Sequence, residues 1–429
     1  MSQTETIQSR AIIVGLNLNN NPAFLSSMQE LKALAKACDI DVVGMHTQNA
    51  PSVNNAFYIG TGKVDEIRES ATLLEADLII FDEALSPMQL RNLTDTLDLT
   101  VLDRTTLILK IFADRAQTKE AKLQVELANL QYMLPRLIGM HASLSRQGGA
   151  SGSMSNKGTG EKKLELDRRH IEHRITELKK NLADIERNRG VLRKQREQSG
   201  IRKIALVGYT NAGKSTIMNW MVDQFGNDDD KKVLEQDMLF ATLDTTVRKI
   251  SPDTLPPFLL SDTVGFIDKL PHTLIKAFHS TLEEVTFADL ILHVIDYSDE
   301  DHDKHMSVTM NTLKELDAAT IPIIHVFNKA ERMMEHNLLP SINGNKIYLS
   351  AKEQIGMDAL LTMISQTLYE DQHECELLIP ISRGDILNTL FQTAVFLHYE
   401  YREDGIFCHC ICNQKEFLKF GQYFVKKII

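Results

Sequence analysis

The sequence predicts an α/β protein with two parallel-sheet domains and a pair of long helices between them. Short apolar runs alternate with helical patterns in both the first and the later part of the chain, which is typical of strands joined by crossover helices. In the segment between, leucine and isoleucine recur every three or four positions, which places them on one stripe of a helix. At about 100–200 residues per domain, a chain of 429 residues has room for several domains.

The first α/β domain is expected over residues 1–115. Each of its apolar runs is bounded by polar residues and therefore predicts a short buried strand. Strands are expected at residues 11–18, 41–48, 55–60 and 76–82, with a helix over residues 23–38. Because helical patterns separate them, these strands should form a parallel sheet.

An antiparallel helical hairpin is expected over residues 116–199. The leucines of residues 123–134 and the heptad positions of residues 164–192 predict its two helices, and we interpret their apolar stripes as core packing. Pro135 should end or kink the first helix. The connection over residues 147–161 is rich in glycine and serine. It is either a plain flexible loop or an adaptable tip that approaches a partner such as RNA.

The charge distribution allows two interpretations of the hairpin surface. The net charge of −11 taken alone argues against a nucleic-acid partner. Residues 161–204, however, hold 14 Lys or Arg against 8 Asp or Glu. Such a basic segment on an acidic protein can bind phosphate locally, and the alternative is a solvated helix face.

A doubly wound α/β domain is expected over residues 200–372, followed by a small α/β domain over residues 373–429. Buried strands are expected at residues 203–207, 257–261, 289–295, 321–327 and 346–350. In the small domain, Cys408, Cys410 and Cys412 alternate and should share one face of a strand. We interpret them as a cysteine-lined core strand, because metal ligands more often follow a C-x-x-C spacing.

Composition excludes several classes of protein. The 43% hydrophobic and 24% charged content is ordinary for a globular protein. Five cysteines are few and odd in number, so we expect a reducing cytoplasmic location rather than a disulfide scaffold. The first ten residues carry no apolar signal segment. No run approaches the roughly 18 apolar residues that span a bilayer, so no stable membrane insertion is expected.

The segment GYTNAGKST at residues 208–216 matches the phosphate-binding pattern G-x-x-x-x-G-K-[ST]. Gly208 and Gly213 let the backbone curl so that its N–H groups face phosphate, and the helix that follows adds positive potential. Lys214 should reach the β- and γ-phosphates, and the Ser215 hydroxyl should bind Mg²⁺. A chance match is disfavoured because a predicted strand precedes the segment and a predicted helix follows it.

Three further motifs, each after a predicted strand, point to guanine nucleotides. DTVG at residues 262–265 provides Asp262, which can hold Mg²⁺ through water, and the Gly265 N–H, which can meet the γ-phosphate. NKAE at residues 328–331 resembles the guanine-reading N-K-x-D, and SAK at residues 350–352 resembles the loop that contacts guanine O6. Four motifs in register at strand ends predict a GTPase site and argue against a P-loop ATPase or kinase.

Within the guanine motif, Asn328 should bond the base, Lys329 should cover its face and Glu331 should accept from guanine N–H groups. The segment over residues 239–250 should supply the switch threonine that completes the Mg²⁺ shell; Thr242 is our choice, with Thr245 and Thr246 as alternatives. The expected nucleotide contacts are Gly208, Asn211, Ala212, Gly213, Lys214, Ser215, Thr216, Asp262, Gly265, Asn328, Lys329, Glu331, Ser350, Ala351 and Lys352. Lys214, Thr242 and Gly265 are expected to act in hydrolysis, and Ser215, Thr242 and Asp262 to hold Mg²⁺.

Three positions modify this expectation. Phe266 stands where many GTPases carry the Gln that orients the attacking water, so slow intrinsic hydrolysis is expected. Glu331 stands in place of Asp, and its extra methylene displaces the carboxylate by about 1.5 Å, which predicts weaker guanine binding or relaxed base choice. Asn211 either ligates a K⁺ ion beside the phosphates or makes a simple loop hydrogen bond.

Long blocks outside these motifs give the chain a family resemblance. They are YIGTGKVDEI (58–67), LSPMQLRNL (85–93), VLDRTTLILKIFADRA (101–116), LQVELANLQYMLPRL (123–137) and GEKKLELDRR (160–169). With the nucleotide motifs, they make the chain similar to the HflX family, ribosome-associated GTPases of the Obg-like group that carry an apolar residue after the DxxG glycine. Departures from that family include GTGEKKLE (158–165), ATLDTT (241–246) and Glu331.

The resemblance implies the four-part architecture described above and binding to the large ribosomal subunit. It further implies that the hairpin tip approaches RNA near the peptidyl transferase region, that the ribosome stimulates GTP hydrolysis, and that stalled ribosomes are split under stress. We expect a monomer that uses Mg²⁺, with GTP as substrate and GDP as product. The alternative is a nucleotide-binding antiassociation factor with weak or no hydrolysis.

Overall fold

The computed structural model describes residues 9–147, 157–198, 201–226, 246–252, 255–263, 265–269, 284–369 and 372–427. The chain divides into two compact units, which we describe separately. The first comprises Met1–Ile185, Met238–Phe240 and Asp268–His279, and the second holds the rest of the chain. Thr242, the preferred switch threonine, and Thr245 lie outside the described residues.

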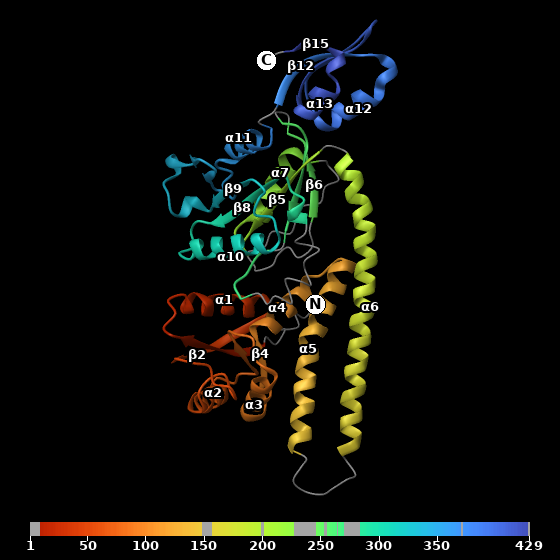
Figure 1. Cartoon of the computed structure of the whole chain (residues 1–429). Helices are drawn as coiled ribbons and strands as arrows, with labels where there is room; N and C mark the ends of the chain where they lie inside the picture. Colours follow the sequence, from red (N-terminus) through yellow and green to blue (C-terminus); the bar gives the residue numbers. More distant parts are fainter. Residues whose placement is uncertain are drawn as a thin grey trace, which may run out of the picture. The chain divides into compact units, whose positions relative to one another are not determined.

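The first unit begins with a four-stranded parallel sheet covered by helices (Figure 1). Its strand order is β2-β1-β3-β4. The strands are β1 (Ser9–Leu18), β2 (Ile40–Ala50), β3 (Leu78–Phe81) and β4 (Thr100–Asp103). The helices are α1 (Phe24–Ala37), α2 (Thr61–Leu73), α3 (Pro87–Leu97) and α4 (Arg104–Arg115). This arrangement confirms the parallel α/β prediction, and β4 is a strand that we did not predict.

The strand predicted at residues 55–60 is wrong. This segment forms a turn, in which the Asn54 side chain accepts hydrogen bonds from the N–H groups of Ala56 and Phe57 at 2.8 and 3.0 Å. Tyr58 has a left-handed φ of 67°, which a strand cannot accommodate. Its apolar side chains still pack on the sheet, since Tyr58 and Ile59 belong to the buried core. The segment is apolar because its side chains are buried, whereas the hydrogen bonds of Asn54 hold its backbone in a turn.

A buried polar cluster lies at the carboxyl end of β3. Asp82 is 1% exposed and accepts hydrogen bonds from Arg104 Nη1 at 2.8 Å and from Ser27 Oγ at 2.7 Å. Arg104, also 1% exposed, bonds Glu30 with its other Nη atom. Lys269 Nζ, from the short segment that groups with this unit, lies 2.5 Å from Asp82 Oδ2. Buried charges of both signs therefore neutralise one another at this strand end.

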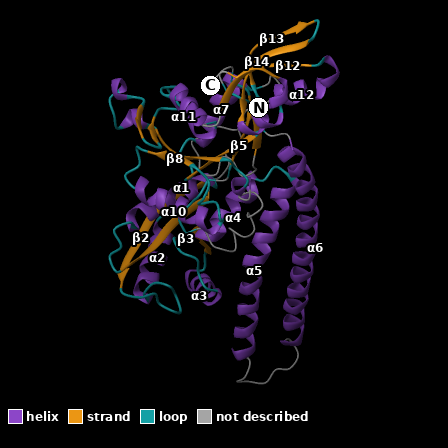
Figure 2. Cartoon of the chain, turned by 45° about the horizontal axis from the view of Figure 1, so that its top comes forward, coloured by secondary structure: helices purple, strands orange, loops and turns teal. Residues whose placement is uncertain are grey.

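The helical hairpin consists of α5 (Lys119–Gln147) and α6 (Lys157–Gln198), which lie side by side in Figures 1 and 2. Leu127, Ile175 and Leu178 form the buried centre of their contact. Arg174 Nε and Nη2 donate to the two oxygens of Glu126 at 2.7 and 2.9 Å. The predicted apolar stripes thus pack against each other, and α5 continues past Pro135 instead of ending there.

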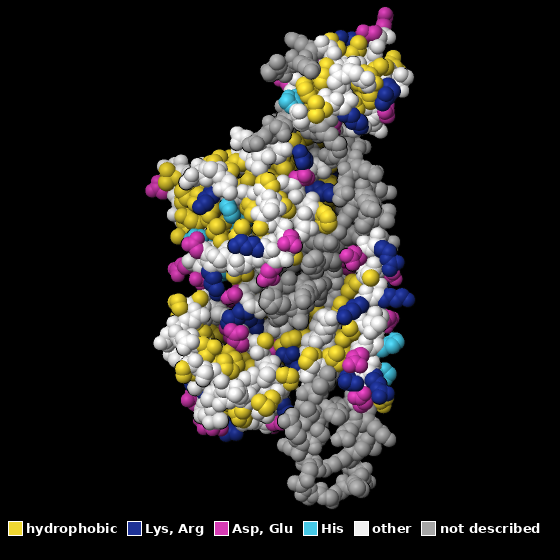
Figure 3. Space-filling view, viewed as in Figure 1, with side chains coloured by type: hydrophobic (Ala, Val, Ile, Leu, Met, Phe, Trp, Pro, Cys, Tyr) yellow, Lys and Arg dark blue, Asp and Glu magenta, His cyan; other side chains and the backbone are white. Residues whose placement is uncertain are grey.

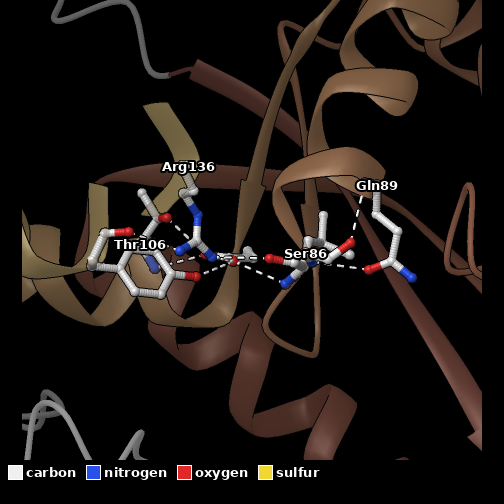
Figure 4. Close-up of polar contacts among 7 residues, drawn as sticks. Ser86, Gln89, Thr106 and Arg136 are labelled. Atoms are coloured by element: carbon white, nitrogen blue, oxygen red, sulfur yellow. Dashed lines mark hydrogen bonds and ion pairs between the residues drawn. The ribbon is translucent and has the colours of Figure 1, made fainter. Parts of the chain in front are cut away.

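A polar latch fixes α5 to the α/β sheet of the same unit (Figure 4). Arg136 Nη2 donates to Asp103 Oδ2 at 3.1 Å and to the Leu85 carbonyl at 3.0 Å. Tyr132 donates its hydroxyl to Asp103, and the Arg136 guanidinium lies 3.3 Å from the centre of the Tyr132 ring. Asp103 also accepts from the Thr106 N–H at 2.9 Å and so caps α4. One buried carboxylate thus joins β4, α4 and α5.

The outer face of the described part of α6 carries charges of both signs, seen as blue and magenta side chains in Figure 3. Glu165 pairs with Arg168 and Arg169 at 3.1 and 3.2 Å, and Arg174 pairs with Glu177 at 2.9 Å. Spacing of three and four residues makes these neighbours on one helix surface. This stretch is therefore a solvated, ion-paired face.

The second unit contains a seven-stranded sheet with strand order β10-β11-β9-β8-β5-β7-β6. Its strands are β5 (Arg202–Gly208), β6 (Thr246–Ile250), β7 (Phe258–Asp262), β8 (Leu290–Asp296), β9 (Ile323–Asn328), β10 (Ser341–Asn343) and β11 (Lys346–Tyr348). Its helical elements are α7 (Lys214–Phe225), α10 (His302–Glu315), α11 (Met357–Leu368), η2 (Ala330–Arg332) and η3 (His336–Leu338). The strands from β11 to β7 are parallel, as predicted, and antiparallel β10 and β6 pair at the edges.

The last domain folds as β-α-β-β-α-β, with its antiparallel strands and helices visible in Figure 2. Its strands are β12 (Gln372–Ile379), β13 (Val395–Arg402), β14 (Gly405–Asn413) and β15 (Phe424–Lys427). Its helical elements are η4 (Ile381–Arg383), α12 (Gly384–Thr393), α13 (Gln414–Lys419) and η5 (Gly421–Tyr423).

The cysteines of this domain line its core. Cys408, Cys410 and Cys412 share the buried face of β14 as predicted, and Cys375 of β12 joins them. Cys375 Sγ lies 3.4 Å from Cys412 Sγ, and all are free thiols. Among the described residues, no group of His, Cys, Asp or Glu has the arrangement of a metal site. The burial of Cys408, Cys410 and Cys412 in this core confirms the cysteine-lined core strand.

Candidate nucleotide-binding site

The phosphate-binding loop connects β5 to α7, and its two glycines are required by geometry. Gly208 has a φ of 151°, and a Cβ at this position would lie 2.1 Å from the Val294 carbonyl oxygen. Gly213 has a φ of 99°, and its Cβ would lie 2.1 Å from Asn328 Nδ2. Both contacts are far inside van der Waals distance, and both backbones lie in a region that favours glycine. The loop can therefore form only with glycine at these positions.

Lys214 begins α7 and turns its ammonium group back over the loop. Its Nζ donates to the carbonyls of Gly208 at 3.0 Å and Tyr209 at 2.8 Å. Only 6% of the residue is exposed, and burial lowers its pKa to about 8, an effect that the Asp262 carboxylate partly opposes. The cation is thus held inside the loop, where a nucleotide phosphate would replace carbonyl oxygens as its partner.

The two predicted Mg²⁺ ligands that the structure describes lie together. Ser215 Oγ donates to Asp262 Oδ2 at 3.0 Å, and Asp262 is fully buried at the end of β7. A hydroxyl and a carboxylate are hard oxygen donors of the kind that Mg²⁺ prefers, so this pair fits the ion. Thr246, one of the alternative switch threonines, lies directly across from Asp262 in the pairing of β6 with β7.

Phe266, the residue after DTVG, is joined to the phosphate-binding loop by two backbone hydrogen bonds. The Phe266 N–H donates to the Gly208 carbonyl at 3.1 Å, and the Thr210 N–H donates to the Phe266 carbonyl at 2.9 Å. Phe266 is 3% exposed, and a Cβ on the neighbouring Gly265 would lie 2.9 Å from Thr210 Cα. Pattern reasoning noted the missing Gln at Phe266 but did not foresee this backbone pairing.

Asn328 connects three of the predicted motifs. Its Nδ2 donates to the Ala212 carbonyl of the phosphate-binding loop at 2.9 Å. Its Oδ1 accepts from the N–H of Ala351, in the SAK loop, at 2.9 Å. Asn328 and Ser350 are buried, and the Ser350 hydroxyl accepts from the Glu353 N–H at 3.2 Å. The asparagine thus fixes the two loops that should surround a base.

The charged residues of the guanine motif have distinct environments. Lys329 Nζ donates to the Asn211 carbonyl at 2.9 Å and to Asp296 Oδ2 at 2.6 Å, a contact that the motifs did not predict. Glu331 Oε2 is buried and has no hydrogen-bond partner among the residues that the structure describes. A buried acceptor without a donor is costly, so this oxygen fits a ligand that brings N–H groups. Guanine N1–H and N2–H₂ are such groups.

The remaining predicted contacts lie on the same loops. Ala212 is buried next to Gly213, Thr216 is half-buried in the first turn of α7, and Lys352 is exposed beyond Ala351. Asn211 has a φ of 60° at the exposed surface of the phosphate-binding loop. Direct hydrogen bonds thus join the phosphate-binding loop to Phe266, Asn328 and Lys329, and join Asn328 to the SAK loop. The nucleotide contacts themselves stay predictions, and Thr242, the predicted switch threonine, lies outside the described residues.

This fold and loop arrangement define a P-loop GTPase. Three family models match successive parts of the chain: "GTP-binding GTPase N-terminal" at residues 25–113, "GTP-binding GTPase Middle Region" at 115–196 and "50S ribosome-binding GTPase" at 203–329.

Whole-chain relatives agree. The chain is 41% identical to "GTPase HflX" of Caldanaerobacter subterraneus over 98% of this chain and 95% of that protein. It is 41% identical to the Lacrimispora saccharolytica protein of the same name over 94% of both chains. With the Escherichia coli protein it shares 35% identity over 89% of this chain and 88% of that one. The chain belongs to the HflX family of GTPases, and it binds and hydrolyses GTP. Among the described residues, none of the helices is both long and apolar enough to span a membrane.

Proposed function

We propose that this GTPase couples GTP hydrolysis to binding of the large ribosomal subunit, and that it acts as a cytoplasmic monomer to split or rescue stalled ribosomes under stress. The observation that carries the proposal is Phe266. It stands where a water-orienting Gln is common, is buried, and has both backbone groups bonded to the phosphate-binding loop. A site that can bind nucleotide but lacks this catalytic group needs a partner to complete it.

The proposed roles of the site residues combine the sequence motifs with the contacts described above. Lys214 and loop amides bind the phosphates, and Ser215 and Asp262 hold Mg²⁺, with Thr242 as the proposed third ligand. The ion would neutralise charge that develops on the phosphoryl oxygens. Asn328 orients the two base-binding loops, while Lys329 covers the base and Glu331 accepts its N–H groups. Asn211 is the proposed K⁺ ligand.

The hairpin is the proposed contact with ribosomal RNA near the peptidyl transferase region. Two observations support it: one matched family model is described as a ribosome-binding GTPase, and residues 161–204 hold 14 Lys or Arg against 8 Asp or Glu. The Asp103 latch attaches α5 to the α/β sheet, so that force on the hairpin would reach the N-terminal domain.

GTP turnover with and without purified large subunits tests the proposal. We expect the subunits to stimulate hydrolysis at least tenfold, and Lys214→Ala to abolish the stimulated rate. Lys314→Ala, an exposed lysine of α10, is the matched control and should behave as wild type. Binding to subunits without stimulation would instead support a nucleotide-binding antiassociation factor, and absence of binding would overturn the ribosomal role.

A further inference from the structure

Asp296 is the last residue of β8 and lies beside the guanine motif. In the pairing of parallel strands β8 and β9, Asp296 is the direct neighbour of Asn328. The next N–H along the chain, that of Tyr297, donates to the Asn328 carbonyl at 2.9 Å. The backbone that carries Asp296 is therefore fixed to the backbone that carries the motif.

Both carboxylate oxygens of Asp296 are used. Oδ2 accepts from Lys329 Nζ at 2.6 Å. Oδ1 accepts from the N–H of Ser298 at 3.0 Å and from its hydroxyl at 2.6 Å. The Lys329 and Asp296 side chains are 18% and 21% exposed, so solvent screens their interaction only in part. Ser298 thus fixes the carboxylate, and the carboxylate fixes the ammonium.

Lys329 is a residue whose position needs such support. Its φ of 59° lies in the left-handed region that side-chain-bearing residues rarely adopt. A free lysine side chain samples many rotamers, and ordering it on ligand binding would oppose affinity. Here the ammonium is already held between Asp296 and the Asn211 carbonyl of the phosphate-binding loop. The methylene stem is therefore confined to the space between β8 and that loop.

We propose that Asp296 is a positioning residue for guanine nucleotide binding, which holds Lys329 in its nucleotide-binding arrangement before the ligand arrives. The inference rests on the proposed role of Lys329 at the base. Nearby acids have other partners: Asp299 Oδ1 accepts from the Asp301 N–H at 2.9 Å, and Asp299 Oδ2 lies 3.5 Å from His305. Asp296 acts on nucleotide retention and not on the chemical step, because its hydrogen bonds to other described residues reach the phosphate-binding loop only through Lys329.

The first experiment measures release of a fluorescent GDP analogue from the full chain carrying Asp296→Asn. We expect release to become about three- to tenfold faster, the range for loss of a partly exposed charge-assisted hydrogen bond. The single-turnover rate of hydrolysis of bound GTP should stay unchanged. Asp303→Asn is the matched control, since this side chain is 92% exposed on α10, and it should release GDP as wild type does.

Ser298→Ala and Lys329→Met separate positioning from general damage. Ser298→Ala retains the ion pair and the backbone N–H bond to Oδ1 but removes the hydroxyl bond, so it should accelerate release less than Asp296→Asn does. In the Lys329→Met background, adding Asp296→Asn should have no further effect, because the group through which it acts is gone. Additive effects of the two substitutions, or unchanged release in Asp296→Asn while Lys329→Met releases faster, would overturn the inference alone. Unchanged release in Lys329→Met would overturn the proposed role of Lys329 as well.

Discussion

His293 lies in the centre of the seven-stranded sheet of the second unit, which we call the G domain. We expect it to lower the stability of this domain in mild acid. It is 1% exposed on β8, and its Nδ1 lies 3.2 Å from Nδ1 of His325, the neighbouring residue on β9. Burial, together with His325 and the Lys214 ammonium, lowers the pKa of His293 from 6.5 to about 3. The pKa of His325 is lowered as well, mainly by burial.

The sign and size of the effect follow from these pKa values. Because the folded pKa is the lower one, the stabilising contribution is complete above the unfolded pKa and is lost as the pH falls towards the folded pKa. At pH 5, about 1.5 units below the unfolded pKa, the loss from His293 alone is about 2 kcal/mol, since each unit contributes about 1.4 kcal/mol. His325 adds to the loss in the same direction.

Unfolding in urea at pH 8 and pH 5 measures this quantity. The chain has one tryptophan, and Trp220 packs against the G-domain core, so its fluorescence reports on that domain. Since the chain has 14 histidines, the informative comparison is between wild type and a variant that cannot titrate at this position. His293→Gln should lose about 2 kcal/mol less than wild type between the two pH values. The exposed control His173→Gln should match wild type, and equal losses in all three proteins would refute the reasoning.

Three further substitutions have expected outcomes. Asp82→Ala removes the buried carboxylate that accepts from Arg104 Nη1 and should destabilise the N-terminal sheet by about 3 kcal/mol, measured by hydrogen exchange of β1 and β3 amides in increasing denaturant; protection equal to wild type would contradict it. Gly213→Ala places a Cβ 2.1 Å from Asn328 Nδ2 and should lower GDP affinity at least a hundredfold in fluorescence titrations; wild-type affinity would show that the loop can shift. Glu331→Asp should raise GDP affinity relative to ADP, and an unchanged ratio would remove the role assigned to the longer carboxylate.

Internal controls are available for two of these substitutions. Asp65→Ala breaks an exposed ion pair with Arg68 and should change stability by less than about 1 kcal/mol. Gly62→Ala introduces a Cβ that meets no atom within 4 Å, so GDP affinity should be unchanged.

Sequence patterns predicted the strands that are buried on both faces. Residues 204–207 (IALV) and 290–295 (LILHVI) are almost entirely apolar because nearly every side chain of β5 and β8 is buried, and strands buried on both faces have such a composition. The antiparallel edge strands β6 and β10 have no apolar run that would predict them, because these strands are short and partly exposed. The segment at residues 55–60 was wrongly predicted as a strand because its apolar side chains are buried although its backbone forms a turn.

The site could be predicted from the sequence where its residues form short contiguous motifs. The phosphate-binding loop and NKAE are contiguous, and their geometry demands particular residues, such as glycine at Gly213. Asp296 is a single acid at a strand end, distant in sequence from the lysine that it holds, so no spacing indicates it. The same is true of Tyr132 and Asp103, which meet because α5 packs against α3 and α4. Contacts between residues that are distant in the sequence can be identified only when the fold is known.

The carbonyl-bound Lys214 ammonium makes nucleotide binding a proton-linked equilibrium. With a pKa of about 8 in the free loop, this lysine is partly deprotonated in mildly alkaline solution. A phosphate brought against the ammonium favours its charged form and raises the pKa again. Binding above pH 8 therefore takes up protons from solution, and affinity falls as the pH rises. The phosphate-binding loop thus makes nucleotide affinity depend on pH, through the lysine that the Gly208 and Tyr209 carbonyls hold.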